Sequence, residues 1–582
     1  MEQSLYQPLL GPEFCRVLTL LPGRREDPLI CGLEVVKLDP NLRYEALSYV
    51  WEEKIPLCLE QKDNVEYRRK KFENFVICNN HQIRVKENLF AALLQLRAMS
   101  GQEPRKLWID ALCIDQCNKA ELGAQVAIMR HIYRSAERVL IWIGDEDDDV
   151  TPSWNLLQRY ARDFQQIVPS TTARLCGIAG RLGSLPYKLV YNADVATTSH
   201  FFEYLIRRAQ PVQNLLSALE VSEENLENVD RGILGRPWFQ RVWTLQEIVV
   251  SRSALLLYGP FSMPWTDFQQ FFNSYNVGRS SNNMNIAHLY HVNTITKAFR
   301  NSELHLSPLL IFTWYRKATD PKDRIFALLG LLPEGLYPTL KPDYHLQPSE
   351  VFIAVTRVCI EVDKSLAFLR TAGLKYRRDV LSPHMASWVP DFVNHEDPEK
   401  SSDEVFDLVD TRIATRYMTP VMGPRSVGLR LQLRGFVVGI MSKCVHPASP
   451  NVPWGLSFCM KPVHAGNWSD GFELSACRAH RSWNDRSDRK NELCRAFGIN
   501  KGWYKEGDWY CVMLGGDDFY ILRPSEGNQP TMKNAASDGP ICSLVCSGAE
   551  EGMGNLSLED GLVQSAFASH EARNDWVDFI LV

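Results

Sequence analysis

The stretch from residue 106 to residue 144 constrains the fold of this chain more than any other feature. Two short apolar segments, KLWIDALCI (106–114) and VLIWIG (139–144), enclose a segment whose apolar residues recur at helical spacing. That helical stripe consists of Leu122, Val126, Met129, Tyr133 and Ala136. A strand, a helix and a second strand at this spacing predict a βαβ unit, and therefore a mostly parallel sheet with a right-handed crossover.

Similar segments on both sides extend this unit into an α/β domain over about residues 15–260. YEALSYVW (44–51) and SALLLYG (253–259) are strand candidates, and KENLFAALLQLRAM (86–99) has the spacing of a helix. Residues 150–230 have a mixed pattern and are interpreted as an insertion. The predicted fold class is α/β, with a mostly parallel sheet flanked by helices.

Beyond residue 260 the pattern changes. DRIFALLGLL (323–332) and PSEVFIAVTRVCIEV (348–362) have helical spacing. Residues 261–425 are therefore predicted to be mainly helical and to pack on the first domain. Strand-like pieces separated by glycine and acidic turns follow, so residues 426–582 are predicted to form a smaller β-rich region. The helical and β-rich parts are expected to restrain the first domain.

Composition and charge narrow the classes of function. A formal charge of -5 over 582 residues provides no broad basic surface, which argues against nucleic acid as a partner. No basic, apolar leader and no apolar run of roughly 20 residues is visible, so a cytoplasmic protein without a membrane span is expected. The 15 cysteines are scattered, and their close pairs lack the companion ligands of zinc sites. Reduced thiols and no bound metal are therefore expected.

An acid among aromatic residues marks the segment RPWFQRVWTLQEIVVS (236–251). Pro237 suits the first position of a helix because its missing N–H would be unpaired there. In that helix Trp243 and Glu247 lie four residues apart, and therefore on one face. Glu247 either pairs with a nearby arginine on a surface helix or serves a reaction, and the helix pattern fits both interpretations.

Three long blocks of the chain resemble, in order and spacing, those of the fungal heterokaryon-incompatibility (HET) domain. They are YEALSYVWE, then LWIDALCIDQ with the helix AELGAQVAIMRHIYRSAERVLIWIG, then RPWFQRVWTLQE. DRIFALLGLLP, PDYHLQPSEVF and ASWVPDF resemble the segments that usually follow. The family is linked to programmed cell death after fusion of genetically different cells and to immune-like signalling. One departure is Glu52, where the first block usually continues with glycine.

The HET domain is itself similar to the Toll-receptor-type (TIR) fold, a parallel sheet with flanking helices. Some TIR domains cleave the nicotinamide glycosidic bond of NAD with a glutamate in a Trp-x-x-x-Glu arrangement, the spacing of Trp243 and Glu247. The resemblance therefore implies Glu247 as the catalytic carboxylate and NAD as a substrate, with no resident cofactor. A fixed carboxylate stabilises the oxocarbenium-like ribose or orders its hydroxyls.

Substrate contacts are expected at the carboxyl ends of the strands. Trp51 and Trp243 offer aromatic faces for the nicotinamide or adenine, although plain core packing fits Trp243 equally well. Arg241 or Arg236 could bind the pyrophosphate. The remaining candidates for substrate binding are Ser48, Tyr49, Asp115 and Gln116.

Four residues are assigned to the structural part of the motif: Asp110, Glu121, Arg236 and Trp238. Asp110 is expected to hold backbone N–H groups of the loop that follows it. Glu121 stands three residues after Asn118, the spacing of a capping box, and is expected to cap the next helix.

Two classes of function remain open. In the first, the chain is an NAD-consuming effector of cell death, because Glu247 lies in an aromatic setting. In the second, the domain self-associates or docks with a sensor protein and triggers death by assembly without catalysis. Glu52 and the lack of a Gly-rich phosphate loop favour the second class.

Overall fold

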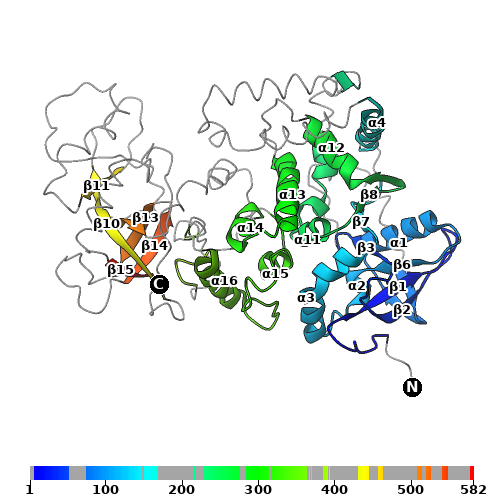
Figure 1. Cartoon of the computed structure of the whole chain (residues 1–582), viewed down its shortest axis with the longest axis horizontal. Helices are drawn as coiled ribbons and strands as arrows, with labels where there is room; N and C mark the ends of the chain where they lie inside the picture. The colour runs from blue at the N-terminus through cyan, green and yellow to red at the C-terminus, as the bar shows by residue number, and fades with distance from the viewer. Residues whose placement is uncertain are drawn as a thin grey trace. The chain divides into compact units, whose positions relative to one another are not determined.

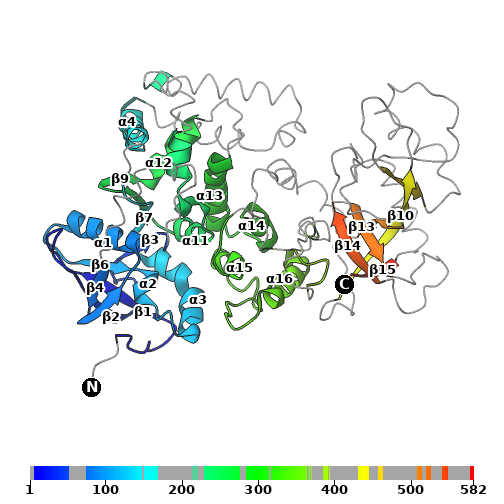
Figure 2. The same ribbon diagram turned by 180° about the vertical axis from the view of Figure 1, so that it is seen from behind.

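Figures 1 and 2 show the computed structural model of the chain from two opposite sides. It describes residues 5–51, 74–146, 150–167, 214–215, 219, 228–275, 284–313, 316–363, 366, 369, 372, 385–390, 392, 430–444, 457–462, 507–513, 519–525, 541–547 and 577–581. The chain divides into two compact units. Residues 1–305 and 312–345 form the first, and residues 306–311 and 346–582 form the second. Glu52 and FFEYLIRRA in the insertion lie outside the described residues.

The first unit is built on a sheet with the strand order β5-β4-β2-β1-β6-β3-β7-β8-β9 (Figure 1). Its strands are β1 (Phe14–Leu20), β2 (Leu29–Lys37), β3 (Glu45–Ser48), β4 (Phe75–Cys78), β5 (His81–Arg84), β6 (Arg105–Trp108), β7 (Val139–Trp142), β8 (Ala254–Tyr258) and β9 (Phe261–Pro264). Strands β6, β3, β7 and β8 run parallel, as the spacing of their segments predicts. In contrast, β1 pairs antiparallel with both β2 and β6, and β9 pairs antiparallel with β8.

The sheet is therefore mixed, and the prediction of a mostly parallel sheet is wrong. The difference comes from short connections between successive strands, both inside the sheet and at its edges. Residues 21–28 connect β1 to β2, which is shorter than the dozen or more residues that a parallel crossover needs. The tight turn at Asn79 and Asn80, both with positive φ, joins β4 to β5 in the same way.

The predicted helices around the parallel strands are present. Helix α1 spans Glu87–Ser100 and α3 spans Lys119–Ser135. The Asn118 side chain accepts a hydrogen bond from the Glu121 N–H at 3.1 Å, which is one half of the expected capping box. The Glu121 carboxylate does not complete that box but turns to other partners.

Helices cover both faces of the parallel strands. The right-handed crossovers from β6 to β7 and from β7 to β8 move in the same direction along the sheet, so α3 and α11 (Trp243–Val249) lie on one face, in contact. Ser48 faces α11 through a hydrogen bond, and its register partner is Ile141. Trp142 therefore points to the other face, where its Nε1 donates to Asn88 of α1 at 2.7 Å.

Two motif segments differ from their predicted elements. KLWIDALCI forms a strand only to Trp108, and its second half is the short helix α2 (Asp110–Cys113). The Asp110 carboxylate starts this turn by accepting from the Ala111 N–H at 2.8 Å. RPWFQRVWTLQE is not one helix but two, α10 (Pro237–Gln240) and α11, with a break at Arg241 that pairs with Lys317.

The structure describes further helices in both units (Figure 2). In the first unit they are α4 (Thr151–Ile167), η2 (Asp230–Leu234), α12 (Trp265–Tyr275), α13 (Met284–Arg300) and α15 (Asp323–Leu329). In the second unit α16 (Pro348–Asp363) and most of α14 (Leu306–Phe312) precede the C-terminal strands. The helices predicted from DRIFALLGLL and PSEVFIAVTRVCIEV are thus confirmed. The first belongs to the same unit as the sheet.

The C-terminal strands form a second sheet with the order β11-β10-β12-β13-β14-β15. They are β10 (Leu431–Cys444), β11 (Ser457–Pro462), β12 (Trp509–Met513), β13 (Phe519–Pro524), β14 (Ile541–Ser547) and β15 (Val577–Leu581). Antiparallel neighbours predominate, and β14 with β15 is a parallel pair. The predicted β-rich character of this region is confirmed.

Three properties of the described residues bear on function. Their cysteines Cys15, Cys31, Cys78, Cys113, Cys117, Cys359 and Cys542 are free thiols, of which Cys117 is exposed. No group of three or more metal-binding side chains lies within these residues. Their helices include none that is both long and apolar enough to cross a membrane.

Candidate functional site

The end of strand β3 at Ser48 is the point on which the candidate site is built. Ser48 Oγ donates a hydrogen bond to Glu247 Oε2 and accepts one from Trp238 Nε1 at 2.7 Å. These two partners follow Ser48 by 199 and 190 residues in the chain, on α11 and α10. Glu247 is 5% exposed and Ser48 is fully buried. The structure thus brings the proposed catalytic glutamate into direct contact with a predicted substrate-binding residue.

Burial dominates the proton affinity of Glu247. It raises the pKa of the carboxyl group from 4.5 to about 8. The hydrogen bond from Ser48 lowers this pKa in part, the Asp110 carboxylate raises it further, and the Arg241 charge and a Tyr133 hydrogen bond lower it. The carboxyl group is therefore largely protonated at neutral pH. A pKa close to the working pH is typical of groups that exchange a proton during a reaction.

Strands β3 and β7 are neighbours whose connections diverge. The chain leaves β3 toward β4 on one side of the sheet and leaves β7 toward β8 on the other. In open α/β sheets ligands bind beyond the carboxyl ends of strands at such a switch point. Ser48 ends β3 at this point. Trp51 follows β3, and its Nε1 donates at 2.9 Å to Oδ2 of Asp110, which follows the neighbouring strand β6.

Asp110, beside this switch point, has several partners. Its side chain also accepts from the backbone of Ala111, and its carbonyl accepts from Gln116 Nε2 at 2.9 Å. Burial raises the pKa of the Asp110 carboxyl, against the lowering effects of Arg241, Trp51 and Ala111. Asp110 and Gln116 thus shape the loop after β6, and Asp110 adds a second carboxyl group near Glu247.

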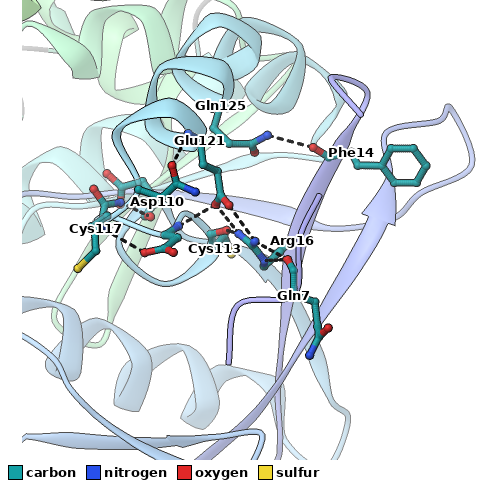
Figure 3. A network of polar contacts seen from close by, with 11 residues as sticks. Gln7, Phe14, Arg16, Asp110, Cys113, Cys117, Glu121 and Gln125 are labelled. Atoms are coloured by element: carbon teal, nitrogen blue, oxygen red, sulfur yellow. Dashed lines mark hydrogen bonds and ion pairs between the residues drawn. The ribbon is translucent and has the colours of Figure 1, made fainter. Parts of the chain in front are cut away.

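A polar network supports the same loop from strand β1 (Figure 3). Arg16, which is 1% exposed, donates to both carboxylate oxygens of Glu121 and to the Cys113 carbonyl at 3.1 Å. Glu121 also accepts from the Asp115 N–H at 2.9 Å. Although burial raises the pKa of Glu121, the bonds from Arg16 and Asp115 outweigh it and lower the pKa. Glu121 is therefore occupied in holding the loop, and Asp115 is part of the same turn.

Arg241 lies in the break between α10 and α11 and is half-exposed. Its Nη1 donates to the Tyr49 carbonyl at 3.3 Å, and within the described ranges it makes no other side-chain hydrogen bond and no ion pair. Its charge lowers the pKa of the carboxyl groups of Asp110, Glu247 and Asp323. Because a guanidinium has five N–H donors, most of those of Arg241 are available to an anion.

Trp243 and Glu247 have different polar partners although both belong to α11. The Trp243 indole, which is half-exposed, lies near Asp323 at the start of α15 and lowers the pKa of its carboxyl group. Arg236 is buried, donates to the Gly232 carbonyl at 3.1 Å and lies 5.5 Å from the centre of the Tyr258 ring.

Two more of the predicted residues are buried. Trp238 packs edge-on against neighbouring aromatic rings. Tyr49 is 5% exposed, and burial together with the nearby Asp110 raises the pKa of its phenol well above 10. Of the aromatic candidates, the half-exposed Trp51 and Trp243 are therefore better placed for stacking than Tyr49.

Sequence reasoning missed three contributors to this site. Tyr133 of α3 donates to the Leu47 carbonyl at 3.2 Å and lies near enough to Glu247 to lower its pKa, but on the sequence it is one apolar member of a helical stripe. Asp323 and Arg316 reach α11 from beyond residue 300. The motif RIFALLGLLP marks the neighbourhood of Asp323, but nothing local to it indicates contact with α11.

Comparison with known proteins agrees with this arrangement. Residues 44–247 match the family model described as heterokaryon incompatibility protein (HET), a range that runs from the start of β3 to Glu247. The chain is 25% identical over 466 residues to heterokaryon incompatibility protein 6, OR allele, of Neurospora crassa. That alignment covers 73% of this chain and 63% of the relative's length. No solved structure matches the chain.

The first unit is thus an α/β domain with a buried, proton-binding glutamate at the carboxyl end of its central strand. The family match covers the parallel strands β3, β6 and β7 and the elements that carry Glu247 and Arg241. Residues 44–247 of this chain are thus similar to the HET domain of fungal heterokaryon-incompatibility proteins.

Proposed function

We propose that this chain is an effector of cell death in heterokaryon incompatibility, and that its HET domain cleaves the nicotinamide glycosidic bond of NAD with Glu247. The observation that carries the enzymatic part is the position of Glu247. It is a buried carboxyl group with a raised pKa, held by Ser48 at the switch point of an α/β sheet. The incompatibility role rests on the family match and on the name of the Neurospora crassa relative.

The raised pKa fits a substrate that carries its own positive charge. An opposite charge within a few ångströms favours the ionised form of a carboxyl group. The cationic nicotinamide ring would therefore favour loss of the proton from Glu247. When the bond breaks, its electron pair returns to the nicotinamide nitrogen and the charge moves to the ribose. The Glu247 carboxylate then stabilises the oxocarbenium-like ribose until water adds to it and releases a proton.

Other residues would hold the rest of the dinucleotide. The spare guanidinium donors of Arg241 suit one phosphate of the pyrophosphate. Trp51, half-exposed beside Asp110, offers an aromatic face at the switch point. Asp115 and Gln116 belong to the loop beside it and are the remaining candidates for contacts to the substrate.

The test is to incubate the purified full-length protein with NAD and to measure free nicotinamide. The same proteins, wild type and Glu247→Gln, are then expressed in cells at matched levels, and viability and cellular NAD are followed. We expect nicotinamide release and loss of NAD with the wild type only. If cells expressing the wild type die while their NAD is unchanged, the enzymatic proposal is wrong and death by assembly remains.

A further inference from the structure

We propose that Arg316 is a positioning residue for the Glu247 site, and that residues 316–330 belong to the same functional unit although they lie beyond the family match at 44–247. This inference rests on the proposed function for its effect on catalysis. Its structural part, that Arg316 fixes the break before α11, stands on contacts within the first unit.

The break between α10 and α11 needs partners from elsewhere in the chain. A helix that stops leaves backbone N–H and C=O groups without partners inside the helix. At this break the Lys317 N–H donates to the Gln240 carbonyl at 2.6 Å, and the Val242 N–H donates to the Lys317 carbonyl at 3.0 Å. The two segments thus form a small parallel bridge at Arg241 and Lys317.

Arg316 supplies the side-chain part of this attachment. It is 3% exposed, and its Nη1 donates to the Arg241 carbonyl at 2.9 Å and lies 3.4 Å from Thr244 Oγ1. The Thr244 hydroxyl in turn lies 2.9 Å from the Trp238 carbonyl and 2.8 Å from the Arg241 carbonyl. One buried guanidinium therefore connects the end of α10, the break and the first turn of α11.

Helix α15 completes the attachment to α11. The Trp243 indole at the start of α11 lies close enough to Asp323 to lower the pKa of its carboxyl group. At Gly330 the two helices approach so closely that a Cβ there would lie 2.2 Å from Gln246 Oε1. Segment 316–330 thus contacts α11 at Trp243, Thr244 and Gln246 and restrains its rotation.

The orientation of α11 determines the positions of Arg241 and Glu247, the two groups that we assign to substrate binding and catalysis. Arg241 precedes the helix and donates to the Tyr49 carbonyl, and Glu247, one turn after Trp243, accepts from Ser48. Misplacing a catalytic group by about 1 Å can reduce a rate roughly 100-fold. Loss of the Arg316 contacts should therefore act on catalysis without a change in any residue that touches NAD.

Two substitutions of Arg316 and one neighbouring control test this in the full-length chain. Arg316→Met removes the guanidinium and its charge, and Arg316→Lys keeps the charge without the forked donors. Lys317→Ala is the matched control, because Lys317 is exposed and its described contacts are made by its backbone. Amide hydrogen exchange of residues 237–249 is compared with that of β1 and β2, together with kcat and KM for nicotinamide release.

We expect Arg316→Met to speed exchange in residues 237–249 by about tenfold or more, to leave β1 and β2 unchanged, and to lower kcat more than it changes KM. Arg316→Lys should fall between Arg316→Met and wild type, and Lys317→Ala should equal wild type. Unchanged exchange in residues 237–249, or an equal rise throughout the unit, would overturn the proposal. If the wild type releases no nicotinamide, the proposed function fails, while the exchange result still decides whether Arg316 positions α11.

Discussion

Ser48 and Glu247, 199 residues apart in the chain, form a buried hydrogen bond that joins the end of β3 to α11. Ser48 accepts a second bond from Trp238, so its hydroxyl is satisfied on both sides. The carboxyl group therefore has a fixed position although it is removed from water. This contact excludes the surface ion pair that the sequence leaves open for Glu247, because an acid pairing on a helix surface would not be buried beneath a strand end. A role of Glu247 in a reaction stays a prediction.

Replacing Glu247 with glutamine should abolish nicotinamide release without unfolding the protein. Glutamine keeps the shape and can still accept from Ser48, but it cannot become an anion, so a loss of about 100-fold or more in rate is expected. The protein should remain folded, because glutamine, like the mostly protonated native side chain, places no charge in the buried site. Glu103→Gln, at an exposed glutamate, is the matched control. Full activity in Glu247→Gln would exclude this residue from the chemistry.

The pH dependence of stability should carry the signature of Glu247. Its pKa is raised to about 8 in the folded protein, so the folded state binds this proton more tightly than the unfolded chain. The resulting stabilisation is complete below about pH 4.5 and is lost as the pH rises through about 8, by an amount on the order of a few kcal/mol. Denaturant titrations of wild type and Glu247→Gln from about pH 5 to about pH 9 should show their difference shrinking or reversing. A constant difference would contradict the raised pKa.

Activity should increase with pH over the range in which the stability contributed by Glu247 is lost. If the Glu247 carboxylate is the working form, kcat/KM of the free enzyme should increase as the pH rises toward about 8. Ser48→Ala removes a bond that lowers the pKa of Glu247, so this increase should move to higher pH. The same change leaves the buried Trp238 N–H without its acceptor, which should lower the free energy of unfolding by about 1–3 kcal/mol. An unshifted pH profile in Ser48→Ala would show that this bond does not tune Glu247.

The Arg16–Glu121 pair should stabilise the loop after β6. Glu121→Gln leaves the buried Arg16 without an ionised partner, and breaking such a pair usually costs about 3–5 kcal/mol. Because the pKa of Glu121 is lowered in the folded state, its contribution is present at neutral pH and is lost as the pH falls through that lowered pKa. Thermal melting of wild type and Glu121→Gln at neutral and acidic pH measures both effects. Equal melting at neutral pH would show that the pair adds no net stability.

The sequence predicts the local elements of this fold better than it predicts their pairing. The apolar stripe from Leu122 to Ala136 and the short apolar runs give α3 and the parallel strands with nearly correct bounds. The hairpin of β1 and β2 escapes prediction, because its residues do not stand out by periodicity and its antiparallel pairing depends on a short connection. This hairpin makes the sheet mixed.

In the candidate site, too, the sequence predicts the local features but not the contacts between residues far apart in the chain. The four-residue spacing of Trp243 and Glu247 is visible in the sequence, as is the cap at Asn118. The break at Arg241 is not visible in the sequence. It is stabilised by backbone hydrogen bonds that join Gln240 and Val242 to Lys317, which lies 75 residues after Val242. Likewise the burial of Glu247 depends on Ser48 and Tyr133, which reach it only after the sheet and α3 have assembled.

A pair of glycine substitutions tests the contact between α11 and α15. Gly330→Ala would place a Cβ 2.2 Å from Gln246 Oε1, too close for any side chain, so the helices must separate or Gln246 must move. Overpacking of this kind costs about 1–3 kcal/mol of stability. Gly123→Ala is the matched control in α3, where the new Cβ would meet nothing closer than the Pro342 carbonyl at 3.6 Å. That change should stabilise the protein by about 0.5–1 kcal/mol, because alanine favours helix over glycine.

Denaturant unfolding measures the free energy of unfolding of each variant, which should fall in Gly330→Ala and rise in Gly123→Ala. Adding Gln246→Ala to Gly330→Ala removes the obstructing amide and should recover part of the loss. Since α11 carries Glu247, nicotinamide release should fall in Gly330→Ala and recover partly with the second substitution, while Gly123→Ala leaves it unchanged. If Gly330→Ala is as stable as the wild type, α11 and α15 are not in the close contact described here, and the attachment of α11 through residues 316–330 is weaker than its hydrogen bonds indicate.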